Sequence, residues 1–281
     1  KEELGFKGLV VTDAMTMRGV SSKYHPGESA VLAIKAGTDL ILMPPDADIA
    51  VDAVVAAVRR GEITEERINE SVMKLLRLKQ WLGLDEDRYV DVEKVFDVVG
   101  SVEHRLLARE IARKSITVLG NSKGILPLRH AEAKNVLDLV CADDEDPSNG
   151  RQLHAELQQR MGNVELAVID PRSDSLEYAA AFNKASASDL VVCQLHFYTR
   201  SGEMTGFIPD SVSSLINRIL KLGKQVVGIS FGNPYIVMDF PTINAYVCAY
   251  SGAAVMVEAA AEVLFAEEPA KGKLPVTIPG V

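Results

Sequence analysis

DLVVCQL, residues 189–195, is an almost unbroken apolar run of strand length, and it decides the fold class. Apolar residues that do not alternate with polar ones are typical of a parallel strand buried on both faces. Five more runs of this kind surround it, at residues 115–119, 135–142, 164–170, 225–230 and 245–251. Helical segments fit between most of them, at residues 150–161, 175–187, 210–222 and 253–266. This alternation predicts an α/β fold, a three-layer αβα sandwich over residues 115–281 with a mostly parallel sheet.

The first 84 residues repeat the alternation on a smaller scale. Apolar runs at residues 8–13 and 38–44 predict two buried strands, with a helix that begins near Pro26 between them. Two more helices are expected, because Asp46 and Thr64 are residue types that cap helices and apolar periodicity follows each of them.

Two strands alone leave open edges and too little sheet for their helices to cover. The first block therefore either joins the sandwich sheet or belongs to something larger. A (β/α)₈ barrel takes about 250 residues, so this block has the size of two βα units with a terminal helix. We expect residues 1–84 to be the C-terminal portion of a TIM-like barrel, incomplete by itself. Residues 85–114 are expected to form an acidic linker and a connecting helix, and residues 115–281 the sandwich domain.

The bulk composition excludes several classes of protein. The formal net charge of −9 offers no basic excess for phosphate contacts, so no nucleic-acid partner is expected. Three cysteines, Cys141, Cys193 and Cys248, lie in apolar runs and predict buried free thiols rather than disulfides or a zinc site. No apolar run is long enough to predict a membrane span, and the first residues do not resemble a signal peptide. Localisation stays open between the cytoplasm and export.

Five stretches resemble conserved parts of glycoside hydrolase family 3, in the family's order. They are GFKGLVVTDAMTMRGV (5–20), AGTDLILMP (36–44), ITEERINESVMKLLRLKQWLGL (63–84), ARKSITVLGNSKGILPL (112–128) and GKLPVTIPG (272–280). The resemblance implies the seventh and eighth strands and last helix of a TIM-like barrel, followed by the family's αβα domain. It also implies that six βα units would precede Lys1, so the chain is expected to be an incomplete fragment, inactive alone.

The resemblance marks Asp13 as the catalytic nucleophile. Barrel active sites lie at the carboxyl ends of strands, where this residue stands. A retaining glycosidase needs an ionised carboxylate to attack the anomeric carbon and a second group to protonate the leaving oxygen. From spacing alone, an aspartate after a strand is more often a turn residue or a helix cap than a nucleophile. Met15 and Met17 flank the turn that follows Asp13, and they either line the sugar pocket or pack under the loop.

The second proton-transferring group is missing from its expected place. In the β-glucosidase branch a glutamate on a loop of the αβα domain serves as the acid, and here Arg200 occupies that position. Arginine does not release a proton at working pH. Glu203 is the possible loop acid, although a solvated loop carboxylate is the simpler interpretation. The departure favours the β-N-acetylglucosaminidase-like branch, in which a histidine upstream of the nucleophile acts.

The expected function is therefore a retaining glycosidase that releases terminal β-linked sugars, most of all N-acetylglucosamine from muropeptides of cell-wall turnover. Its partner is a carbohydrate substrate, and no metal or organic cofactor is needed. Two alternatives stay open: a β-glucosidase or xylosidase of the same family, and a non-catalytic carbohydrate-binding or interaction module. Self-association through the open barrel edge is also expected.

Among the five histidines, which show no metal-ligand spacing, His196 stands out because it ends a strand beside an expected crevice.

Overall fold

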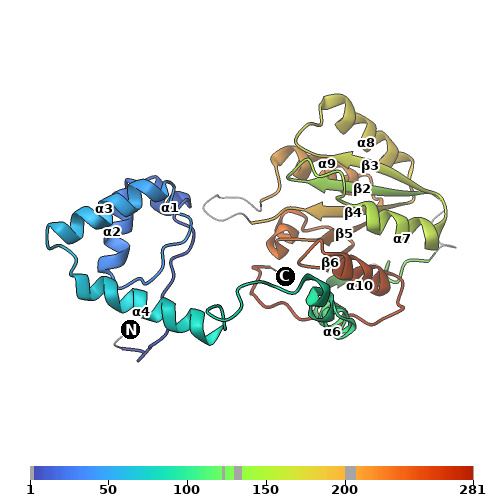
Figure 1. Cartoon of the computed structure of the whole chain (residues 1–281). Helices are drawn as coiled ribbons and strands as arrows, with labels where there is room; N and C mark the ends of the chain where they lie inside the picture. The colour runs from blue at the N-terminus through green and yellow to red at the C-terminus, as the bar shows by residue number, and fades with distance from the viewer. Residues whose placement is uncertain (1–2, 122–123, 130–134, 200–206, 281) are drawn as a thin grey trace. The chain divides into compact units, whose positions relative to one another are not determined.

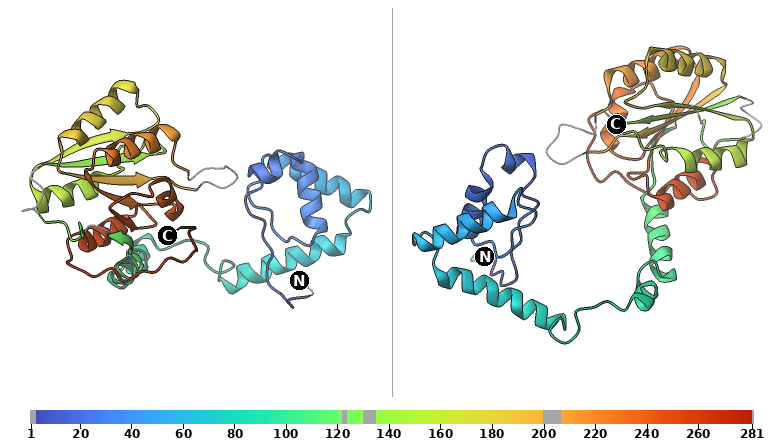
Figure 2. Two further views of the ribbon diagram at one scale, coloured as in Figure 1. Left: turned by 180° about the vertical axis from the view of Figure 1, so that it is seen from behind. Right: turned by 45° about the horizontal axis from the view of Figure 1, so that its top comes forward.

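The computed structural model describes residues 3–121, 124–129, 135–199 and 207–280. It divides into two compact units, Lys1–Val95 and Phe96–Val281 (Figures 1 and 2). The boundaries at residues 84 and 115 that were expected from the sequence stay a prediction.

Unit 1 is built from helices that begin where the sequence predicts. Pro26 occupies the first turn of its helix, and Asp46 and Thr64 each cap a helix by accepting a backbone N–H, from Ile49 at 2.9 Å and from Arg67 at 3.2 Å. The helices are α1 (Arg18–Ser21), α2 (Pro26–Lys35), α3 (Ala47–Arg59) and α4 (Glu65–Trp81), followed by the 3₁₀ turn η1 (Val92–Lys94). The short helix α5 (Val95–Val98) begins at the boundary with unit 2. The short helix α1 and the 3₁₀ turn η1 were not expected from the sequence.

The two buried strands expected in this unit are a wrong prediction. Residues 8–13 and 38–44 run side by side with a single parallel bridge between Val11 and Leu40, and Val11 is 45% exposed. Two extended segments give each other only one pairing edge, so their other edges and their outer faces stay uncovered. The barrel origin of this unit and its self-association remain predictions.

A buried carboxylate joins the two extended segments to α4. The Asp39 side chain is fully buried, and its Oδ2 accepts a hydrogen bond from the backbone N–H of Val10 at 3.0 Å. From α4, the Ser71 hydroxyl donates to Oδ1 at 2.7 Å, and the Lys74 ammonium lies 3.1 Å from Oδ2. The Arg67 guanidinium adds a second positive charge, and its Nη1 lies 3.6 Å from Oδ1 of Asp39. Asp39 therefore fixes the segment that leads to Asp13.

Unit 2 contains a six-stranded sheet in the order β1-β6-β5-β4-β2-β3. All neighbours are parallel except β1 and β6. The strands are β1 (Thr117–Asn121), β2 (Val136–Ala142), β3 (Val164–Ile169), β4 (Leu190–His196), β5 (Gln225–Ser230) and β6 (Ala245–Cys248). The other elements are α6 (Val102–Ser115), α7 (Arg151–Met161), α8 (Ser175–Ala187), α9 (Asp210–Lys221), η3 (Pro234–Asp239) and α10 (Ala254–Leu264).

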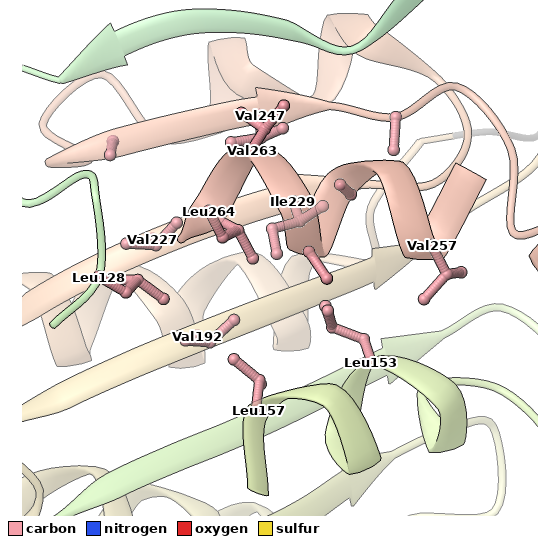
Figure 3. Packing of buried hydrophobic residues seen from close by; sticks show 14 of the residues in the cluster. Leu128, Leu153, Leu157, Val192, Val227, Ile229, Val247, Val257, Val263 and Leu264 are labelled. Atoms are coloured by element: carbon pink, nitrogen blue, oxygen red, sulfur yellow. The ribbon is translucent and has the colours of Figure 1, made fainter. Parts of the chain in front are cut away.

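Helices cover both faces of this sheet, so the αβα prediction is confirmed (Figure 1). On one face, Leu153 and Leu157 of α7 and Val257 of α10 pack toward Val192 and Ile229 (Figure 3). On the other face, α8 and α9 contribute a second core cluster that includes Ala181, Ala185, Leu215 and Ile216. The three cysteines are free and buried, as expected. Among the described helices, none has the length and hydropathy to cross a membrane.

Replacing Asp39 by Ala should destabilise unit 1 by about 3 kcal/mol, because it leaves partly buried cations and the Val10 N–H without their acceptor. Amide hydrogen exchange of α2 to α4 is the measurement, since it reports this unit apart from unit 2. Glu62→Ala is the matched control, because it removes a carboxylate that pairs with Arg60 at the exposed surface. Equal protection factors in the two variants would contradict the anchoring role of Asp39.

Candidate functional site

Asp13 lies at the end of the first extended segment with its carboxylate exposed. Its Oδ1 accepts a hydrogen bond from the backbone N–H of Ala14 at 2.7 Å, and within the described ranges Oδ2 accepts none. Two residues further on, Met15 is buried (6% exposed), and its backbone N–H donates to the carbonyl of Leu42 at 3.0 Å. Met17 is half-buried and precedes the first residue of α1. The carboxylate is thus held through one oxygen and free at the other, which suits a nucleophile.

Arg200 and the possible loop acid Glu203 lie outside the described residues. Among the side chains that the structure does describe, no group of three His, Cys, Asp or Glu residues is placed to hold a metal ion.

A buried polar network that sequence analysis missed runs through the centre of unit 2. Asp138, in the middle of β2, is fully buried and accepts from the Gln194 amide, whose Nε2 is 2.9 Å from both carboxylate oxygens. His154 of α7 places its Nδ1 3.0 Å from the same carboxylate. Burial raises the pKa of Asp138, and the hydrogen bonds from His154 and Gln194 oppose that rise. The signals in the sequence that could have indicated this network are two polar residues within apolar strand segments, Asp138 in residues 135–142 and Gln194 in residues 189–195.

His196 continues the network at the carboxyl end of β4. It is 3% exposed, its Nε2 lies 3.3 Å from Oε1 of Gln194, and its ring stacks on Phe231 with centroids 4.8 Å apart. Because Gln194 donates its Nε2 to Asp138, its Oε1 must accept, so hydrogen-bond matching assigns the His196 proton to Nε2. The lone pair then stays on Nδ1, 3.4 Å from the Tyr198 hydroxyl. Burial lowers the pKa of His196 to about 4, so the ring is neutral at pH 7.

Two cavities open at the carboxyl ends of the strands of unit 2. A cavity of 430 Å³ lies beyond β2 and β3 and is lined by Asp143, Asp170 and the first turns of α8 and α9. A cavity of 310 Å³ lies at the start of α7, and His196 forms part of its wall. A strand-end histidine beside a crevice was expected from the sequence, and the structure places it there. In unit 1, a mainly apolar cavity of 390 Å³ lies along α3 and α4 and does not include Asp13.

The lowered pKa of His196 makes the stability of unit 2 depend on pH. Between pH 6.5 and about 4 the unfolded chain binds a proton on this ring and the folded chain does not. The free energy of unfolding should therefore decrease as the pH falls through that window, with a slope of up to about 1.4 kcal/mol per pH unit from this group. Urea unfolding of His196→Gln at several pH values should show a flatter slope than the parent. His104→Gln, at an exposed site, is the control, and a slope unchanged by His196→Gln would contradict the assignment.

Comparison with known proteins covers both units. The model described as glycosyl hydrolase family 3 N terminal domain matches residues 1–78, and the model described as glycosyl hydrolase family 3 C-terminal domain matches residues 116–281.

Similar curated and solved proteins extend these matches across the chain. A beta-N-acetylglucosaminidase/beta-glucosidase of Cellulomonas fimi is 26% identical over 98% of this chain and 50% of its own length. Beta-hexosaminidase A of Pseudoalteromonas piscicida is 25% identical over 99% of the chain and 51% of its own. The structure of a glycoside hydrolase family 3 beta-N-acetylglucosaminidase from Paenibacillus sp. strain FPU-7 superposes with a TM-score of 0.82 and 29% identity, over 98% of this chain and 52% of that one.

The chain thus spans about half the length of these relatives. Since the two family models account for residues 1–78 and 116–281, the chain belongs to glycosyl hydrolase family 3.

Proposed function

We propose that this chain carries the nucleophile of a retaining β-glycosidase that releases terminal N-acetylglucosamine, and that Asp13 is that nucleophile. The observation that carries the proposal is the Asp13 carboxylate, which is exposed and, among the described residues, accepts one hydrogen bond through Oδ1 and none at Oδ2. The buried Asp39 cluster supports it, because it holds the segment on which Asp13 stands.

In the proposed reaction, Oδ2 of Asp13 attacks the anomeric carbon as the glycosidic oxygen leaves with a proton from an acid. A glycosyl-enzyme ester results, and water then displaces the carboxylate with the same group acting as base, so the anomeric configuration is retained. Glu203 remains a possible acid on this chain, and Met17 a possible pocket residue. The burial of Met15 favours a packing role for it.

The choice of N-acetylglucosamine rests on the relatives. The Cellulomonas fimi and Paenibacillus proteins both carry β-N-acetylglucosaminidase in their names, and the first also carries β-glucosidase. A sugar from cell-wall muropeptides fits this specificity. A β-glucosidase or xylosidase remains the alternative within the family, since a putative beta-xylosidase of Formosa agariphila is also similar, at 25% identity.

Replacing Asp13 by Ala, in an enzyme that contains this sequence, should lower kcat on 4-nitrophenyl N-acetyl-β-glucosaminide by about 10³-fold or more, because the covalent intermediate cannot form. Sodium azide should restore part of the turnover by attacking in place of the carboxylate, and the product should be the α-glycosyl azide. Asp48→Ala is the matched control, since Asp48 is an exposed carboxylate in the first turn of α3.

Full activity of the Asp13→Ala enzyme would contradict the proposal. Retained sugar affinity with no turnover in either parent or variant would favour the non-catalytic binding module instead. The matching β-glucoside and β-xyloside substrates, assayed in parallel, distinguish the three specificities.

A further inference from the structure

The 310 Å³ cavity of unit 2 lies where the winding of the sheet reverses. From β2 the chain passes through α7 to β3 on one side, and from β3 it returns through α8 to β4 on the other side of β2. The helices of these two connections cover opposite faces of the sheet, so a crevice forms between the carboxyl ends of β2 and β4. Ligands of open α/β sheets bind outside such a point. We call this space the switch-point cavity, and its wall includes Arg151, Gln152, Leu153, His196 and Gly252.

The first turn of α7 brings hydrogen-bond donors to the switch-point cavity. The helix begins after Gly150, which has no capping side chain, and its first turn contains no acidic residue. The first helical hydrogen bond is donated by His154 to the carbonyl of Gly150 at 2.9 Å. The N–H groups of Gln152 and Leu153 precede it and have no acceptor in the part of the chain that the structure describes. Two backbone donors are thus open at the wall of the cavity.

His196 brings an acceptor to the same cavity. Its Nε2 proton is committed to Gln194, and the contact of Nδ1 with the Tyr198 hydroxyl, at 3.4 Å, is long for a hydrogen bond. The ring is neutral at pH 7 because burial lowers its pKa to about 4, so the lone pair on Nδ1 is retained. A Cβ atom at position 252 would lie 3.7 Å from Nδ1 and 2.5 Å from the Tyr198 hydroxyl, so a side chain there would crowd both atoms.

The surrounding charges disfavour a strongly anionic ligand. Asp144 raises the pKa of His196, which places its carboxylate close enough to act on the ring, and Asp146 lies two residues further along the same loop. Arg151, at the wall of the cavity, is the positive charge that opposes them. A neutral group that both donates and accepts satisfies the site without a net charge, and a hydroxyl does both.

We propose that the switch-point cavity binds the hydroxyl-bearing ring of a neutral saccharide. One hydroxyl donates to Nδ1 of His196 and accepts from an N–H of the first turn of α7. The volume is near the lower end of the range of about 300–1,000 Å³ for small-molecule sites, which suits one sugar ring. The choice of a sugar rests on the proposed function, whereas the hydrogen-bonding geometry does not depend on Asp13.

The test is a titration of the ¹⁵N-labelled 281-residue chain with N,N′-diacetylchitobiose, followed by amide and imidazole chemical shifts. The shifts should concentrate on Gln152, Leu153 and Gly252 and on the ring nitrogens of His196. Gly252→Ala should weaken this binding about tenfold, because its methyl group would lie 3.7 Å from Nδ1 of His196 and clash with the Tyr198 hydroxyl at 2.5 Å. Gly120→Ala is the matched control, since a Cβ there meets no atom within 4 Å.

His196→Phe removes the acceptor but keeps a ring to stack on Phe231, and it should abolish the shifts at Gln152 and Leu153. If that variant does not fold, Gly252→Ala and the shift map decide the question. The proposal is overturned if these residues do not respond to the disaccharide, or if inorganic phosphate shifts them and the disaccharide does not. Shifts that appear only around Asp13 and vanish in Asp13→Asn would refute the switch-point cavity and leave the proposed function standing.

Discussion

The central strands β2 and β4 are buried from end to end, and every polar group placed on them must find its partner inside the protein. Their backbones satisfy each other through seven parallel pairs, from Val136 with Leu190 to Ala142 with His196. Besides His196 at the end of β4, Asp138 and Gln194 are polar side chains buried on these strands, and Asp138 accepts hydrogen bonds from Gln194 and contacts His154 of α7. The same arrangement aligns α7 on the sheet and determines the tautomer of His196 at the strand end.

The architecture of unit 2 follows from patterns that a sequence displays directly. Unbroken apolar runs such as residues 189–195 require cover on both faces, and Gly, Pro and capping residues mark where the helices between them start. The observed β4 and α8 differ from the predicted segments by at most one residue. Helix caps such as Asp46 and Thr64 act through local hydrogen bonds, which is why unit 1 helices were also predictable.

Long-range constraints were not accessible in this way. Val11 reads as a buried strand residue, but its burial depends on neighbouring strands that its own sequence does not specify. The partnership of Asp138 with Gln194 joins residues 56 positions apart, so neither sequence run reveals it. Asp13 was identified through the resemblance of its surroundings to a family, and the hydrogen bond that its Oδ1 accepts from Ala14 is the part that the structure adds.

The central claim is that Asp13 forms a covalent bond with a sugar. The most direct measurement is peptide mapping by mass spectrometry after an enzyme containing this sequence reacts with 5-fluoro-N-acetyl-β-glucosaminyl fluoride, a slowly hydrolysed substrate. If Asp13 is the nucleophile, one added sugar is expected on Asp13, in the peptide that contains Thr12 and Ala14. An adduct on a different carboxylate, or steady turnover with no trapped intermediate, would contradict it.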